Sequence, residues 1–212
     1  IGEINERFCN AIHLATIYSI GLHQLQPLVK KFLTKFPDTS TSLEYHSFNK
    51  IYDLVAHHEI DFGFVAYPVQ KTGIVSKTFV EENLILVQSP HHPAFKKKTL
   101  VLSDLDDVKF VAFTSNTPTR NAIDSFLKQH RSSPRIVSEY DNVETLKSAV
   151  ALGIGASIVP EITVRRELQE GALESLPVKG LTLKRPLGIL YPKKKNFNHL
   201  YEWAKNHDNY FI

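Results

Sequence analysis

The chain has 212 residues and a formal net charge of +3, with 42% hydrophobic and 22% charged residues. This composition is ordinary for a soluble α/β protein, and the length suffices for one large domain or two small lobes. No apolar run approaches the ~20 residues that a membrane span needs, and no secretory signal is visible, so we expect no membrane partner. The sequence contains no methionine, and we therefore expect a processed protein or a fragment.

The cysteine and lysine residues limit the possible partners. A single cysteine, Cys9, excludes an internal disulfide and a cysteine-rich zinc site, which fits a reducing cytoplasm. The lysine runs at 96–98 and 193–195 are open to two interpretations, nucleic-acid patches or solvated loops. Because neither run is interleaved with aromatic residues or follows one helix face, the sequence favours solvated loops.

The first part of the chain alternates strand-like and helix-like patterns. Apolar residues recur at helical spacing between Leu22 and Phe36, and Pro37 ends that helix because the residue before proline avoids the helical region. Ser47 is predicted to cap the next helix. The predicted elements are strand 12–17, helix 22–36, strand 41–46, helix 48–57 and strand 61–66.

A second set of elements continues this alternation. In chain order they are strands 74–80, 84–87 and 109–113, a helix carrying Ile123, Phe126 and Leu127, strand 135–139, helix 143–152 and strand 156–159. A strand at 181–191 and an amphipathic helix near 197–208 complete the pattern. Strands that alternate with helices of this length predict an α/β fold with parallel sheets covered on both faces.

Two Tyr-Pro pairs suggest how the chain is divided. If the last helix returns to the first lobe, Tyr67-Pro68 and Tyr191-Pro192 become crossover points. Lobe I then comprises residues 11–67 and 192–212, and lobe II comprises residues 68–191. Two lobes joined by two extended strands form a hinge with a cleft between them.

Three turns rich in hydroxyl groups follow predicted strands, at 16–21, 44–47 and 114–119. In an open α/β sheet, ligands bind beyond the carboxyl ends of the strands, at helix N-termini. In the third turn Pro118 suits the first helical position, so Thr117 is the expected cap. Free backbone N–H groups, with the hydroxyls of Ser115, Thr117 and Thr119, would suit a carboxylate, sulfate or phosphate.

Plain helix capping is the alternative explanation for each of these turns, because serine and threonine cap many helices. An anion site requires that several turns face one cleft. The sequence leaves both interpretations open.

Signatures of catalysis are scarce. The histidine pairs His57-His58 and His91-His92 are adjacent in sequence, and on a helix adjacent side chains do not chelate one metal well. Gly153 and Gly155 are too few for a dinucleotide-binding turn and are better explained as a helix stop. We therefore expect no catalytic residue, no metal site and no cofactor.

Several segments, in order, resemble the effector-binding domain of LysR-type transcriptional regulators. Residues 15–20 resemble the family's first strand. The turn 116–120 resembles the corresponding turn in the branch of the family that regulates sulfur or carbon-fixation genes. The other segments and the family patterns they resemble are 25–37 (L-P-x-L-x-x-F, then F/Y-P), 54–64 (L-x-x-G-x-I-D-L-A-I/F), 81–93 (E-x-L-x-L-V-x-P-x-x-H-P-L) and 150–160 (V-x-x-G-x-G-I-x-L-L-P). Each pattern alone is weak, whereas several in the correct order are specific.

The resemblance implies an α/β fold of two Rossmann-like lobes joined by two crossover strands, similar to type 2 periplasmic binding proteins. A small-molecule inducer would lie between the lobes, bound by residues from both. The residues that the resemblance places at this effector site are Tyr18, Ser19, Ser47, Ala66, Thr114, Ser115, Thr117, Asn142 and Ser148.

The sequence departs from the family pattern in three places. Ala66 is apolar where the family often has a hydroxyl, which puts one anion contact in doubt. His58 stands where the family often has glycine. The N-terminal helix-turn-helix is missing, so residues 1–10 are expected to be either the end of a linker helix or residues foreign to the protein.

The resemblance also implies partners: a small inducer of the carboxylate, sulfate or phosphate class, DNA through the missing N-terminal domain only, and further copies of the chain. Family members form homodimers or tetramers, in which the helix from Leu22 to Phe36 would pack near the Ile123–Leu127 helix of another copy. The expected function is to bind the inducer in the cytoplasm and transmit this to DNA binding. Two alternatives remain, a periplasmic solute-binding protein and a lyase or transferase of the same fold.

Overall fold

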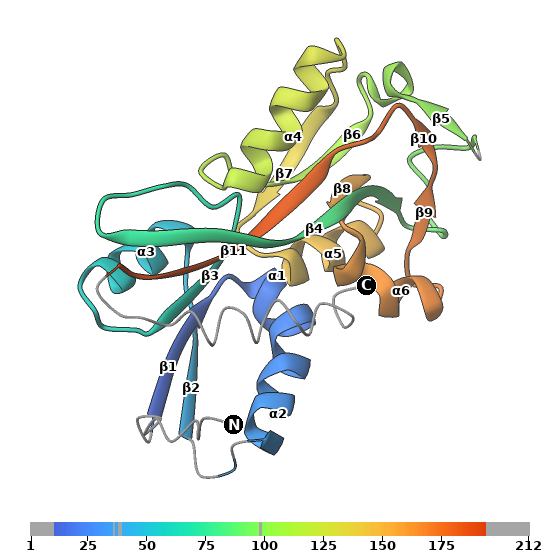
Figure 1. The fold of residues 1–212 in the computed structure, drawn as a ribbon. Coiled ribbons are helices and arrows are strands. Elements are labelled where there is room, and N and C mark those ends of the chain that lie inside the picture. Colours follow the sequence, from blue (N-terminus) through green and yellow to red (C-terminus); the bar gives the residue numbers. More distant parts are fainter. Residues whose placement is uncertain (1–10, 36, 38–39, 98, 194–212) are drawn as a thin grey trace. The chain divides into compact units, whose positions relative to one another are not determined.

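The computed structural model describes residues 11–35, 37, 40–97 and 99–193, which contain both strands and helices (Figure 1). The strands are β1 (Ala11–Thr16), β2 (Ser40–Tyr45), β3 (Phe62–Ala66), β4 (Ile74–Gln88), β5 (Leu100–Val101), β6 (Lys109–Phe113), β7 (Arg135–Tyr140), β8 (Ser157–Pro160), β9 (Glu174–Leu176), β10 (Val178–Lys179) and β11 (Lys184–Pro192). The α-helices are α1 (Tyr18–Ile20), α2 (Gln26–Lys35), α3 (Phe48–Ala56), α4 (Pro118–Gln129), α5 (Val143–Ala151) and α6 (Arg165–Gln169).

The described chain separates into two compact units, residues 11–80 with 188–193 and residues 81–187. Strands β4 and β11 each run through both units. The chain thus passes from one unit to the other inside these strands, later than Tyr67-Pro68 and earlier than Tyr191-Pro192. The sequence predicted two strands where β4 is a single strand of 15 residues. The polar run at 81–83 continues this strand because Glu82 is buried and paired with Arg185 on β11.

The first unit is built on parallel strands in the order β2-β1-β3. Helix α3 packs against β3, and Gly63 allows this close approach because a Cβ there would lie 2.5 Å from Cγ2 of Ile51. The buried residues that form the core of this unit are Ala15, Ile51, Tyr52, Leu54, Val55, Ile60, Val65, Ile74 and Leu190.

The second unit contains the parallel pair β6-β7, and β4 pairs antiparallel with β8 and β9. The N–H of Val111 on β6 donates to the carbonyl of Ala156, which connects β6 to the start of β8. Gly155 lies so close to β6 that a Cβ would come within 2.5 Å of the Lys109 carbonyl oxygen. Helices α4 and α5 both pack on β6, and their buried residues share one core that includes Ile123, Leu127, Leu146 and Val150.

Several local predictions can be compared with the structure. Gly153 has φ +81° directly after α5, which confirms the predicted helix stop. His58 has φ +59°, a left-handed conformation that glycine adopts more readily, at the position where the family often has glycine. The predicted helix near 197–208 and Cys9 lie outside the described residues. No helix in the described part of the chain is long and apolar enough to cross a membrane.

Candidate functional site

The first unit gathers four of the predicted site residues at one edge of its sheet. Because β1, β2 and β3 are parallel neighbours, the residues that follow them meet at their carboxyl ends. Tyr18 and Ser19 follow β1, Ser47 follows β2, and Ala66 is the last residue of β3. Backbone hydrogen bonds hold this edge together, from His46 N–H to the Thr16 carbonyl (3.0 Å) and from Ile17 N–H to the Phe64 carbonyl (3.2 Å).

The helix after β1 is irregular where it leaves this edge. The predicted single helix at 22–36 begins earlier, at Tyr18, and passes through a π-helical turn at Gly21–Leu25 before it continues as α2. Such π-turns are rare and are frequently found at functional sites. The turn therefore marks the start of this helix as a segment with a local constraint.

Two tyrosines stack at the same edge. The rings of Tyr18 and Tyr45 lie 5.2 Å apart at 28°, and Tyr18 remains 45% exposed. Gly21 has an ordinary helical φ of −60°, so backbone freedom does not explain it. A Cβ at Gly21 would lie 2.5 Å from the Tyr45 ring and from Thr16 Cγ2. Glycine at this position makes the helix about 0.8–1 kcal/mol less stable than alanine would. The ring of Tyr45 occupies the space where the Cβ of alanine would lie.

Ser47 does not cap α3 as predicted. It occupies the N-cap position with an extended backbone (φ −68°, ψ 157°), but its side chain makes no capping hydrogen bond. The prediction of a Ser47 cap was wrong because a suitable residue type at the first position does not by itself orient the hydroxyl toward the helix N–H groups. The hydroxyl is exposed and makes no hydrogen bond within the described residues.

In the second unit, Thr117 caps α4 as predicted, and the turn that precedes it is tightly hydrogen-bonded. Its hydroxyl accepts from the N–H of Arg120 (3.3 Å) and donates its proton to the Thr114 carbonyl (3.0 Å). The N–H of Thr114 in turn donates to the Tyr140 carbonyl at the end of β7 (2.9 Å). Because a hydroxyl has one proton, Thr117 has no hydrogen left to donate to an anion.

Arg120 fixes the strand ends on which this turn stands, a role that the sequence did not predict. Its guanidinium donates to the carbonyl of Phe113, the last residue of β6, and to Glu139 on β7, each at 2.7 Å. It also pairs with Asp124 one helical turn later. Burial opposes the charged form, but the hydrogen bonds and charges of Glu139 and Asp124 outweigh it and raise the pKa of Arg120. Arg120 is thus a fixed cation that joins β6, β7 and α4.

Asn142 and Ser148 lie on the neighbouring helix α5. The Asn142 side chain caps this helix by accepting from the N–H of Thr145 (3.0 Å). Ser148 donates its hydroxyl proton to the Glu144 carbonyl of its own helix (2.9 Å). Ser148 also lines an open pocket of about 390 Å³, together with Tyr140, Glu144, Thr145, Ala149, Leu152 and Ile154. The structure thus places Asn142 at the carboxyl end of β7 and Ser148 further along the helix.

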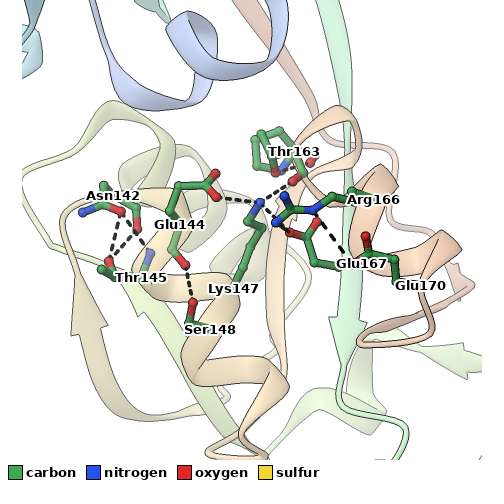
Figure 2. A network of polar contacts seen from close by, with 10 residues as sticks. Asn142, Glu144, Thr145, Lys147, Ser148, Thr163, Arg166, Glu167 and Glu170 are labelled. Carbon is green, nitrogen blue, oxygen red and sulfur yellow. Dashed lines mark hydrogen bonds and ion pairs between the residues drawn. The ribbon is translucent and has the colours of Figure 1, made fainter.

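A buried lysine fixes α5 to the following segment. Figure 2 shows the Nζ of Lys147 between two carboxylates, Glu144 (3.0 Å) and Glu167 (3.1 Å), with a third bond to the Thr163 carbonyl (2.7 Å). Burial raises the pKa of Glu167, but hydrogen bonds from its own backbone N–H and from Lys147, and the charge of Lys147, outweigh burial and hold the pKa below its usual value. The three donors of Lys147 are therefore all used within the protein.

Apart from Ser148, the predicted site residues form two sets, one at the strand ends of each unit. Tyr18, Ser19, Ser47 and Ala66 come together in the first unit, and Thr114, Ser115, Thr117 and Asn142 come together in the second. In the part of the chain that the structure describes, no group of His, Cys, Asp and Glu side chains is placed to hold a metal ion.

Comparison with known proteins places the chain in one family. The profile of the LysR substrate binding domain matches residues 5–208. A probable RuBisCO transcriptional regulator of Cyanidium caldarium is 29% identical over 86% of this chain and 59% of its own length. The HTH-type transcriptional activator CmpR of Synechocystis is 28% identical over 88% of this chain and 61% of its own length. The chain therefore spans between about half and three fifths of the length of such relatives.

Solved structures agree with this assignment. The regulatory domain of Synechocystis CcmR, in complex with 2-PG, superposes with a TM-score of 0.82 at 21% identity and covers 93% of this chain and 96% of its own. The effector-binding domain of QuiR, in complex with shikimate, has a TM-score of 0.82 at 20% identity, with 94% and 97% covered. The two-unit α/β fold is thus that of type 2 periplasmic binding proteins. The chain belongs to the LysR substrate-binding domain family.

Proposed function

We propose that the chain senses a small anionic inducer through the strand-end turns of its two units and transmits binding to a DNA-binding helix-turn-helix of the full-length protein in the cytoplasm. One observation carries the proposal. In each unit, polar helix starts gather at the carboxyl ends of parallel strands, where α/β folds bind ligands. The small ligands of related domains, 2-PG and shikimate, support this choice. We propose no catalytic step, and the relatives are regulators rather than solute-binding proteins.

The hydrogen-bond inventory narrows which groups would hold the anion. Thr117 gives its proton to the Thr114 carbonyl, so it positions the turn rather than binding the ligand. The hydroxyl and backbone N–H of Ser115 make no hydrogen bond within the described residues and are suitable donors, as is the hydroxyl of Ser47 in the other unit. One helix end supplies about 0.3–1 kcal/mol, or about 2 when partly buried. Donors from both units are therefore needed for useful affinity.

Transmission requires that the inducer distinguish two arrangements of the regulator. A ligand shifts an equilibrium only by its differential affinity for the two states. A coupling of about 1–3 kcal/mol would change DNA occupancy about 5- to 150-fold. An inducer that fitted both arrangements equally would leave transcription unchanged.

The proposal predicts that small anions stabilise the folded chain. A panel of carboxylates, sulfates and phosphates is expected to contain at least one compound that raises the melting temperature in a concentration-dependent way, because a ligand that binds only the folded state stabilises it. Neutral and cationic compounds of similar size serve as controls. If only those raise the melting temperature, the anion assignment is wrong.

Thr117 provides an internal check on the same titration. Thr117→Val is expected to lower the free energy of unfolding by about 0.5–2 kcal/mol through loss of the cap. The variant should also weaken binding of the stabilising anion, because the turn that presents Ser115 loses the hydrogen bonds of the Thr117 hydroxyl to Thr114 and Arg120. Thr117→Ser retains the cap and is the matched control. Equal losses of stability with and without anion would mean that Thr117 only caps α4.

We also propose that the face formed by α4 and β7 pairs with a second copy of the chain. β7 pairs only with β6 among the described strands, and its Ile136 and Val137 are 39% and 40% exposed. The adjoining pocket of about 510 Å³ is lined by Phe110, Asp124, Leu127, Lys128, Arg131, Ser132, Ser133, Pro134 and Ile136. Apolar side chains with a polar rim are the usual anatomy of a protein interface.

Replacing Ile136 by aspartate is expected to convert the dimer to a monomer in sedimentation experiments, because a charge would be buried in the interface without a partner. Ile154→Asp is the matched control, since Ile154 is 37% exposed on α5's side of the unit, where it lines the other pocket. A dimer that survives Ile136→Asp, or dissociates equally with Ile154→Asp, would contradict this interface.

A further inference from the structure

We infer that the stacked pair Tyr18–Tyr45 selects an inducer that carries a flat, unsaturated portion next to its anionic group. The inference rests on the proposed function and names the class of ligand for the same site. Tyr45 then becomes a specificity-determining residue, although it was not among the residues that the family resemblance indicated.

The position of the pair supports a role in recognition. Tyr18 starts the helix after β1, and Tyr45 ends β2, so both rings stand at the strand edge that also presents Ser47. The rings are stacked, with centroids 5.2 Å apart. Nevertheless Tyr18 remains 45% exposed, so its ring is not part of the buried core of this unit. An exposed stacked ring offers one aromatic face to a ligand.

The missing Cβ of Gly21 matches the position of the Tyr45 ring and of Thr16 Cγ2. Gly21 stands in a helix at φ −60°, where alanine would favour the helix more, and its missing Cβ leaves the space that the Tyr45 ring fills. The π-helical turn begins at this same glycine.

The phenol groups add a polar element to this wall. Neither the Tyr18 hydroxyl nor the Tyr45 hydroxyl makes a hydrogen bond to another described residue. Each can therefore donate one hydrogen bond to a ligand oxygen. An aromatic face and phenol donors suit an unsaturated or aromatic carboxylate better than a compact inorganic anion, which has no face to stack.

Three anionic probes separate these possibilities: benzoate, cyclohexanecarboxylate and sulfate. Benzoate and cyclohexanecarboxylate share one carboxylate and a six-membered ring, but only benzoate has a π face. Apparent dissociation constants from thermal-shift titrations of the 212-residue chain are expected to favour benzoate about three- to tenfold, as an aromatic pair contributes.

Side-chain changes test whether the pair is responsible. Tyr18→Leu keeps apolar area at an exposed position and should abolish the preference for benzoate without lowering the melting temperature of the free chain appreciably. Tyr45→Ala should also abolish the preference, with a loss of stability because the ring fills the space against Gly21, and Gly21→Ala should reduce the preference by displacing that ring. Val101→Ala, an exposed apolar change in the other unit, is the control that should retain the preference.

The outcomes separate this inference from the proposed function. If cyclohexanecarboxylate or sulfate binds as tightly as benzoate, or if the preference persists in Tyr18→Leu and Tyr45→Ala, the aromatic wall is overturned while the anion site stands. If no anion in the wider panel binds, the proposed function fails and the inference fails with it.

Discussion

Replacing Arg185 by methionine is expected to lower the free energy of unfolding by about 3–5 kcal/mol, because the change breaks a buried ion pair by removing one of its two partners. Arg185 is 1% exposed on β11, and Glu82, its partner on β4, is 9% exposed. The guanidinium donates to Glu82 through both Nε and Nη2. Since a domain is stable by only about 5–15 kcal/mol, urea denaturation should show a large fall in midpoint.

The double variant Glu82→Met with Arg185→Met distinguishes pairing from simple packing. Replacing a whole buried ion pair by apolar residues is often neutral, so the double variant should be more stable than Arg185→Met alone. If Arg185→Met costs less than about 1 kcal/mol, or if the two changes simply add, the pair does not fix the crossover strands as the structure suggests.

Lys147→Met is expected to lower the free energy of unfolding by about 1.5–3 kcal/mol, because it removes a buried cation from the partly exposed Glu167 carboxylate and from a carbonyl. Lys147 is 4% exposed and donates to Glu167 and to the Thr163 carbonyl. The second oxygen of Glu167, Oε2, is buried and already has no hydrogen-bond partner within the described residues. In the variant, Oε1 would keep only the contact with the exposed Arg166, and Oε2 would remain without a partner among the described residues.

Arg166 is the matched control for Lys147, because it contacts the same carboxylate oxygen from the solvent side. It lies 3.2 Å from Glu167 Oε1, and its side chain is 73% exposed. Arg166→Met should therefore change stability by less than about 1 kcal/mol. Comparable losses for Arg166→Met and Lys147→Met would mean that burial of the lysine adds nothing.

The Lys147–Glu167 pair also predicts that the free energy of unfolding depends on pH. The folded-state pKa of Glu167 lies below its unfolded value of about 4.3. Its contribution is therefore present above the unfolded pKa and is lost as the pH falls through the folded pKa. In Lys147→Met this acid-side loss should become shallower, because the cation that lowers the pKa is gone. An unchanged slope below pH 5 would contradict the role of Lys147.

Much of the fold could be predicted because its signals are local. The strand at Lys109–Phe113 and the helix start at Pro118 agree with the sequence prediction. The spacing of apolar residues and the type of capping residue are both visible within a few consecutive residues. The short elements β5, β9, β10 and α6 were missed because they are too brief to show a period. The continuity of β4 was missed because it depends on a partner about a hundred residues away, Arg185.

The candidate site was only partly predictable for the same reason. Residue type and position identified the turns after the strands, and the Thr117 cap follows from Pro118. The hydrogen bonds of each hydroxyl depend on its neighbours in space. The Thr117 hydroxyl donates to the Thr114 carbonyl, whereas the Ser47 hydroxyl does not cap α3. The stacking of Tyr18 on Tyr45 required the parallel pairing of β1 and β2, which no local pattern reveals.

Amide hydrogen exchange of the 212-residue chain, with and without the anion that raises its melting temperature most, tests the central claim most directly. The account predicts slower exchange at the strand-end turns of both units, at residues 17–21 and 46–48 in the first and 114–119 and 142–145 in the second. Protection confined to one unit, or to the α4–β7 face, would contradict a site built from both.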